Sequence, residues 1–391
     1  MLFPCRIYNL GKQERVPLLV QLQETRKFEA TDPRDKIFAL VGLVEEGEDE
    51  ADLPDCLQPD YFKSVQEVYQ SVTIYLIKKY LDLRVLAYVQ HVTSDIVADI
   101  DLHVSEPSDE MPSWIVRWES KHAIGSPIID CDHWKASGDK PIDIKVIKRT
   151  SALKIRGIYF DKIKYCSDIF QNSNYIVDDE EVLALRNPVL SAWRQAGDHY
   201  TKYPTGESAE EVFMITTLCG RGASGERLKS NDQLLSAFYA YLHYVFIMRQ
   251  CYLSFKRQKL VNSNSSIHER VKNSQNPISS AEPGSAIHTL HNTFGSLGEG
   301  HNPSSYVCEL SFARQRKVFS TLMKYVGMGP AAMREGDIVC ILFGSRVPYV
   351  LRPHDDHYEL IGECYVHGLM DGEALEISEK KGAQADYFEL R

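Results

Sequence analysis

Apolar residues recur with a helical period early in the chain. Between residues 64 and 80 they stand three or four positions apart, at Val65, Val68, Tyr69, Val72 and Leu76. Ser64 and Glu67 match a capping box, in which each side chain bonds the backbone of the other residue. The pattern therefore predicts an amphipathic helix over residues 64–80.

The period changes to strict alternation near residue 142. Residues 142–148 alternate apolar and charged side chains, and residues 153–160 continue the pattern after a short turn. Four further apolar runs follow at 318–326, 337–343, 349–352 and 358–365. They are separated by turn signals at 327–330, 344–346 and 354–356. We expect the 142–165 hairpin and the C-terminal strands 306–366 to form one small antiparallel sheet or barrel.

Helical patterns return between the hairpin and the C-terminal strands. Ser208 and Glu211 form a second capping box, and residues 232–255 carry a wide apolar stripe. The predicted fold class is therefore α+β: an N-terminal helical region, a small β-sheet or barrel, and helices inserted between the parts of that sheet.

These patterns divide the chain into four predicted segments. Residues 1–125 form a helical region, and residues 140–261 hold the β-hairpin and the inserted helices. Residues 262–304 are rich in Ser, Asn, Gly and His, which favours a disordered loop. Residues 305–380 are predicted to be the C-terminal, strand-rich part of the same domain as the hairpin.

Composition argues against a nucleic-acid partner and against a membrane-spanning segment. The 391 residues include 44 Lys and Arg against 54 Asp and Glu, and the formal net charge is −10. A nucleic-acid partner is not expected, because phosphate binding needs a basic surface. Membrane spanning is not expected either, because the longest apolar run, residues 237–248, is shorter than the roughly 20 residues that a bilayer requires.

The N-terminus and the cysteines predict a cytoplasmic protein. No basic start followed by an apolar run precedes a cleavage site, so a secretory signal is not indicated. The nine cysteines are odd in number and widely spaced, and no Cys-x-x-Cys occurs. That usage favours reduced thiols that fill the core rather than a disulfide framework or a zinc finger.

Two clusters are candidate binding residues. Asp32, Arg34 and Asp35 stand at the start of a helix predicted to end at Gly42, where they could bind a polar group. Capping and the helix dipole explain the two acids without any ligand, and the sequence favours that structural role. Trp114 and Trp118 could form an aromatic contact surface, although burial against the first helices explains them too.

Other motifs do not indicate a catalytic, metal or cofactor site. Residues 220–225 match Gly-x-Gly-x-x-Gly, but a capped helix precedes them where a dinucleotide site needs a strand. The sequence His-Asp-Asp-His at 354–357 lacks a clear third metal ligand and reads as a hairpin tip. Cys131 and His133 are too close in sequence to converge easily. No catalytic residue, metal or cofactor is predicted, so the sequence favours a non-enzymatic chain and leaves the question of an enzyme open.

Several blocks resemble fungal heterokaryon incompatibility (HET-domain) proteins. Residues 30–43, Ala-Thr-Asp-Pro-Arg-Asp-Lys-Ile-Phe-Ala-Leu-Val-Gly-Leu, are similar to the segment just after the effector domain of that family. Residues 111–118 resemble its Leu-Pro-Ser-Trp-Val-Pro-Asp-Trp stretch, with Val116 and Arg117 in place of Pro and Asp. The remaining similar blocks follow in the family's order at 59–69, 327–330, 336–340, 348–352 and 362–368.

The resemblance implies an accessory role. The family's effector region precedes these blocks, and only about 30 residues stand before them here. The implied function is a non-enzymatic accessory or regulatory region in vegetative incompatibility and non-self-triggered cell death. Its partner would be a protein, either a HET effector or another incompatibility factor. Two alternatives stay open: a hydrolase with a dispersed Cys/His site, and an unrelated protein- or ligand-binding module.

Overall fold

The computed structural model describes most of the chain. The described residues are 15–48, 53–91, 111–120, 128, 133–170, 187–197, 203–222, 225–228, 232–258 and 295–391. Their α-helices are α1 (Leu18–Thr25), α2 (Asp35–Phe38), α3 (Val65–Tyr80), α6 (Pro188–Gly197), α7 (Ala209–Thr217), α8 (Asp232–Gln258), α11 (Pro303–Glu309) and α12 (Glu373–Lys380). Short 3-10 turns are η1 (Val41–Leu43), η2 (Glu45–Gly47), η4 (Arg84–Tyr88) and η6 (Leu310–Ala313).

Helix α3 confirms the helix predicted from apolar spacing. The backbone N–H of Glu67 donates to Ser64 Oγ at 3.2 Å, and the backbone N–H of Ser64 donates to the Glu67 carboxylate at 2.8 Å. Both halves of the capping box are therefore made. The helix ends at Leu81, whose φ of 51° is left-handed.

The helix predicted to run to Gly42 is shorter than expected. Only α2, one turn from Asp35 to Phe38, is α-helical, and η1 follows it. Ile37, Phe38 and Leu40 are all buried. The apolar residues of this segment are therefore buried although the α-helix is only one turn long.

The described strands form one mostly antiparallel sheet of nine strands. They are β1 (Ile144–Ile147), β2 (Ala152–Cys166), β3 (Arg316–Thr321), β4 (Val326–Pro330), β5 (Ile338–Leu342), β6 (Tyr349–Pro353), β7 (Tyr358–Glu363), β8 (Tyr365–Val366) and β9 (Asp386–Leu390). β1 pairs with β2 in antiparallel register, with Ile144 opposite Ile155. The predicted α+β class and the 142–165 hairpin are both confirmed.

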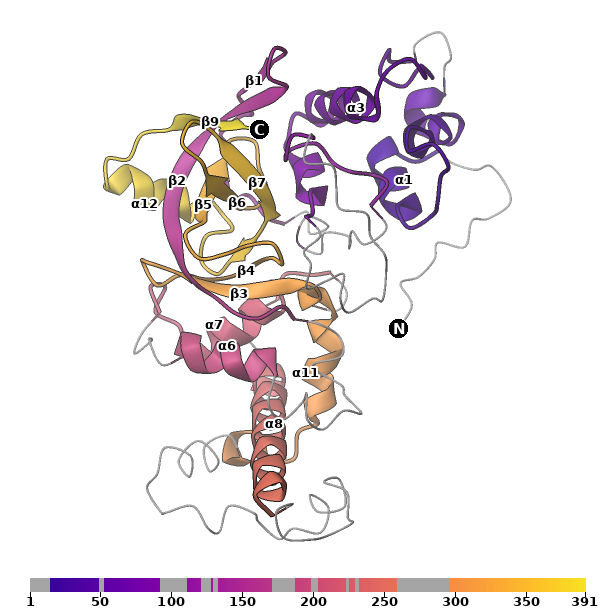
Figure 1. Cartoon of the computed structure of the whole chain (residues 1–391). Coiled ribbons are helices and arrows are strands. Elements are labelled where there is room, and N and C mark those ends of the chain that lie inside the picture. Colours follow the sequence, from indigo (N-terminus) through magenta and orange to yellow (C-terminus); the bar gives the residue numbers. More distant parts are fainter. Residues whose placement is uncertain are drawn as a thin grey trace.

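The long strand β2 joins the two halves of the sheet (Figure 1). Its first part pairs with β1, β9 and β5, and its last part pairs with β3. The pairing register shifts between Tyr159 and Asp161 and again between Ile163 and Tyr165. Such irregularities bend a strand, which lets β2 serve both halves.

The C-terminal strands differ in detail from their prediction. The run 318–326 splits into β3 and β4, because the chain turns at Lys324 with a φ of 70°. The glycines at 327–330 lie within β4 rather than in a turn. A Cβ at Gly327 would lie 2.4 Å from the Phe319 ring, so the close approach of β3 and β4 requires glycine there.

Strand β9 extends the sheet past residue 380, where the predicted strand-rich segment ended. It pairs with β2, placing Leu390 opposite Leu153. It meets β7 at a single parallel pair, Tyr358 with Leu390. The strands β5, β6, β7, β9 and β2 therefore follow one another around a curled sheet, and that one pair joins β7 to β9.

The inserted helices pack against the β3–β4 side of the sheet (Figure 1). Trp193 of α6 meets Phe213 of α7 with ring centroids 5.2 Å apart, and Phe238 of α8 meets Tyr306 of α11 at 5.0 Å. Most of the predicted loop 262–304 lies outside the described residues. In the described part of the chain, no helix has the length and apolar character to cross a membrane.

Candidate functional site

The structure brings Asp32, Arg34 and Asp35 together at one polar corner. The Asp32 carboxylate accepts hydrogen bonds from Nε and Nη2 of Arg34 at 2.9 and 2.7 Å. It also accepts the backbone N–H of Arg34 at 3.0 Å. Asp32 therefore closes a local turn around Arg34 instead of capping a long helix.

The corner holds the loop at residues 60–64 in place. Arg34 Nη1 donates to the backbone carbonyls of Tyr61 and Lys63 at 2.7 and 2.8 Å. The Tyr61 hydroxyl donates to the carboxylate of Asp35. Side-chain hydrogen bonds thus join residues 34–35 to the loop at residues 60–64, although the two segments lie apart in sequence.

The polar side chains of the corner form hydrogen bonds with one another and with the loop backbone. The hydrogen bonds from Arg34 lower the pKa of Asp32, and the hydrogen bond to Asp35 raises the pKa of Tyr61. Asp32 is therefore ionised and Tyr61 protonated at neutral pH. Each side-chain nitrogen of Arg34 already has an acceptor, so the corner can support a surface better than it can bind a polar ligand.

The surface that this corner supports is aromatic. Tyr61 packs edge-on against Phe38 with ring centroids 5.4 Å apart, while about half of its side chain stays exposed. The next residue, Phe62, is fully exposed. We call Tyr61 and Phe62 the aromatic tip. Sequence reasoning missed it, because only the tertiary structure shows that Arg34 bonds the backbone on both sides of Phe62.

Trp114 and Trp118 lie in the core instead of forming a contact surface. Both side chains are almost completely buried. The Trp114 indole donates to the carbonyl of Ser151 in the β1–β2 turn at 3.0 Å. Trp118 packs beside Tyr88 and under the guanidinium of Arg26, whose carbon lies 5.4 Å from the ring centroid.

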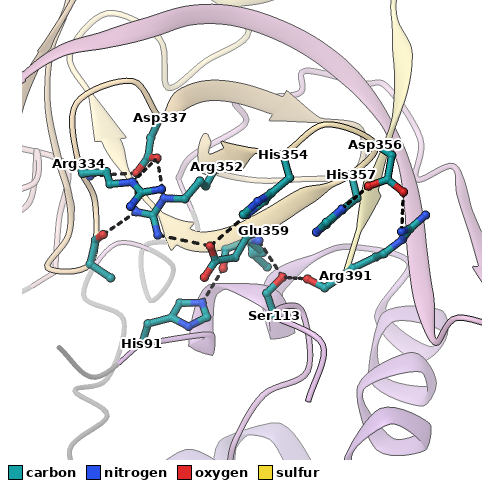
Figure 2. Close-up of polar contacts among 12 residues, drawn as sticks. His91, Ser113, Arg334, Asp337, Arg352, His354, Asp356, His357, Glu359 and Arg391 are labelled. Carbon is teal, nitrogen blue, oxygen red and sulfur yellow. Dashed lines mark hydrogen bonds and ion pairs between the residues drawn. The ribbon is translucent and has the colours of Figure 1, made fainter. Parts of the chain in front are cut away.

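A polar seam joins the N-terminal region to the sheet (Figure 2). Ser113 Oγ accepts the backbone N–H of Leu360 at 2.8 Å and donates to the carbonyl of Arg391. His91 Nε2 donates to the carbonyl of Leu360 at 2.6 Å. Because the ring is packed among protein atoms, its desolvation lowers the pKa of His91.

Charged side chains extend the seam along β6 and β7 (Figure 2). Arg352 donates from Nε and Nη2 to Asp337 at 2.9 and 3.0 Å and from Nη1 to Glu359 at 3.3 Å. The rings of His354 and His357 stack with centroids 4.7 Å apart. No group of three or more His, Cys, Asp or Glu suited to a metal ion occurs among the described residues.

A cavity of about 400 Å³ lies where the inserted helices meet the end of the sheet. Its wall includes Glu207 before α7, Arg227 after it, and His367 after β8. Glu373, the first residue of α12, lines it as well. The sequence offered no signal for this site, because its wall combines residues from five separate segments.

His367 links two residues in the cavity wall. Its Nε2 lies 2.8 Å from the Glu207 carboxylate, and its Nδ1 lies 3.0 Å from the Tyr365 hydroxyl. Burial opposes ionisation of Glu207, but hydrogen bonds from Thr205 and His367 outweigh it, and the pKa of Glu207 is lowered. Burial raises the pKa of Tyr365 well above its usual range, so that hydroxyl stays protonated.

Four of the described cysteines have thiols that are not activated. Burial raises the pKa of Cys56 to about 11 and that of Cys166 to about 12. It also raises the pKa values of the buried thiols of Cys340 and Cys364. These four sulfurs are therefore protonated at neutral pH, and a thiol is a poor nucleophile. Cys131, the candidate partner of His133, lies outside the described residues.

The C-terminal third of the chain resembles a known family. Residues 261–388 match the model of the Het-6 beta-barrel domain. Strands β3 to β8 lie wholly inside this match, whereas β1 and β2, which complete the same sheet, precede it.

One curated relative shares part of this sequence. A stretch of 80 residues is 36% identical to heterokaryon incompatibility protein 6, OR allele, of Neurospora crassa. It covers 19% of this chain and 12% of the length of that protein. No solved structure matches the chain. The C-terminal region is therefore similar to the Het-6 beta-barrel domain, and part of the chain is similar to a fungal heterokaryon incompatibility protein, which supports the resemblance that the ordered sequence blocks indicated.

Proposed function

We propose that this chain acts in vegetative incompatibility as a non-enzymatic accessory region that engages a protein partner. The partner would be an incompatibility effector or another incompatibility factor in the cytoplasm. Its engagement would regulate the cell death that follows fusion of unlike hyphae. The similarity to the Neurospora protein supports a role in vegetative incompatibility. The aromatic tip supports the binding of a protein partner.

The aromatic tip is the single observation that carries this proposal. An exposed aromatic side chain binds a partner most effectively when it is already held in place, because little conformational entropy is then lost on binding. Phe62 is fully exposed, and the Arg34 contacts hold the backbone on both sides of it. Aromatic residues supply much of the binding energy at protein interfaces.

The buried thiols support the non-enzymatic part of the proposal. A hydrolase with a dispersed Cys/His site needs a thiolate near neutral pH. Burial raises the pKa values of Cys56, Cys166, Cys340 and Cys364, which disfavours that state.

Gene replacement in the native fungus tests the proposal. The gene is deleted and then restored as wild type, as Phe62→Ser, or as Leu322→Ser. Leu322 is a matched control, because it is also an exposed apolar residue but lies in the β3–β4 turn. We expect deletion to abolish death of incompatible fused cells. Wild type and Leu322→Ser should restore it, and Phe62→Ser should not.

Two results would contradict the proposal. Death caused by this chain alone, in a host without any incompatibility effector, would show that it is not accessory. Full restoration by Phe62→Ser, at a protein level equal to wild type, would show that the aromatic tip does not engage the partner.

A further inference from the structure

The cavity between the inserted helices and the sheet is a second potential site, distinct from the aromatic tip. Its polar wall comes from the turn before α7 and from the segment between β8 and α12. Its volume of about 400 Å³ lies within the range of small-molecule pockets. Cavities at the junction of two structural units are frequent ligand sites.

The charges in this wall do not cancel. Arg227 pairs with Asp371, so these two contribute no net charge. Glu207 pairs with His367, and the Glu373 carboxylate accepts the backbone N–H of Asp371. Glu207 and Glu373 are therefore two carboxylates in the wall that pair with no Lys or Arg among the described residues. A carboxylate beside a cavity favours a cationic occupant.

Another part of the cavity wall is apolar. Ile215, Leu228 and Met370 are apolar lining residues. Trp134, which also lines the cavity and is 2% exposed, has an indole N–H without a hydrogen-bond partner among the residues that the structure describes. Within the described part of the chain, the wall thus offers an apolar face, a donor that has no acceptor, and carboxylates that no Lys or Arg neutralises.

We propose that this cavity binds a small organic amine in its protonated form. The ammonium group would lie against Glu207 and Glu373, and the apolar body would lie against Ile215, Leu228 and Met370. Small anions would be excluded by the same two carboxylates. This site is independent of the proposed partner contact at Phe62.

Calorimetric titration of the full chain with three probes of similar size and shape tests the proposal. Tyramine carries an ammonium group, 4-ethylphenol is neutral, and 4-hydroxyphenylacetate carries a carboxylate. We expect tyramine to bind at least tenfold more tightly than 4-ethylphenol and to weaken as NaCl is raised, because salt screens charges near the surface. The carboxylate probe should not bind.

Variants assign the binding to the cavity. Glu207→Gln and Glu373→Gln should each weaken tyramine binding at least tenfold, while the exposed control Glu335→Gln should leave it unchanged. Thermal unfolding of each variant shows whether it is folded. If one of the two cavity variants does not fold, the other still tests the proposal. Failure of tyramine to bind would overturn the proposal. Equal binding of 4-ethylphenol, or unchanged binding in both folded cavity variants, would also overturn it.

Discussion

Ser113 and Leu360 are 247 positions apart in sequence, yet the Ser113 hydroxyl accepts the backbone N–H of Leu360 at 2.8 Å. The same hydroxyl donates to the carbonyl of Arg391. One small side chain thus joins the N-terminal region to two strands, β7 and the end of β9. Trp114 and Trp118 are the conspicuous residues of this segment in the sequence, but it is Ser113 that joins the N-terminal region to these strands.

Replacing Ser113 tests the strength of that connection. Ser113→Ala leaves the N–H of Leu360 without its acceptor, and a buried, unpaired donor costs about 1–3 kcal/mol. We expect the free energy of unfolding, measured by urea denaturation, to fall by that amount. Ser71→Ala is the control, because Ser71 bonds only within its own helix and should change stability by less than about 0.5 kcal/mol. Equal effects of both variants would refute the role of Ser113.

The buried ion pair of Arg316 and Glu363 can be tested by removing one of its charges or both. Arg316 Nη2 lies 2.6 Å from the Glu363 carboxylate, and both side chains are less than one-tenth exposed. Arg316→Met leaves a buried carboxylate without its cation and should lower the unfolding free energy by about 3–5 kcal/mol. Arg316→Met combined with Glu363→Leu removes both charges, so we expect a smaller loss. A double variant that is less stable than Arg316→Met would contradict this account.

His91 should make stability depend on pH. Desolvation lowers its pKa, although Leu360 and Glu359 favour the cation, while Arg117 and Arg352 disfavour it. The folded state then binds fewer protons than the unfolded state below about pH 6.5. The contribution of His91 is therefore complete above that pH and is lost as the pH falls, by at most about 1.4 kcal/mol per pH unit.

Unfolding of wild type and His91→Gln at pH 7.5 and 5.5 measures this effect. We expect the loss of stability on acidification to be smaller in His91→Gln, because Gln does not titrate. His301→Gln is the control, since His301 is exposed and should behave like wild type. An identical loss in wild type and His91→Gln would rule out the role of His91.

The thiols should react slowly. Burial raises the pKa of Cys56 to about 11 and that of Cys166 to about 12, so the thiolate fraction at pH 7.5 is very small. We expect iodoacetamide to label both residues far more slowly than free cysteine, as measured by peptide mass spectrometry over time. Labelling in guanidinium chloride provides the control, because the unfolded chain should react fully. Labelling of either residue within seconds in the folded protein would revive the hydrolase alternative.

Local sequence signals predicted the elements whose stabilising contacts are local. Ser64 with Glu67 and Ser208 with Glu211 bond within four residues, so both capping boxes could be read from the sequence and both are present. The alternation at 142–148 predicted the hairpin for the same reason, since its partner strand follows at once. The ordered blocks also indicated the family, which the Het-6 match supports.

The tertiary structure alone decided how these elements close around one another. Strand β9 joins β2 across more than 200 residues of sequence, and no local pattern specifies such a pairing. The Arg34 contacts, the Ser113 seam and the cavity of Glu207 and His367 likewise combine distant segments. Hydrogen bonds and ion pairs act over a few ångströms of space, and their energies do not depend on the separation of the two residues in sequence. These contacts therefore depend on where folding places each group.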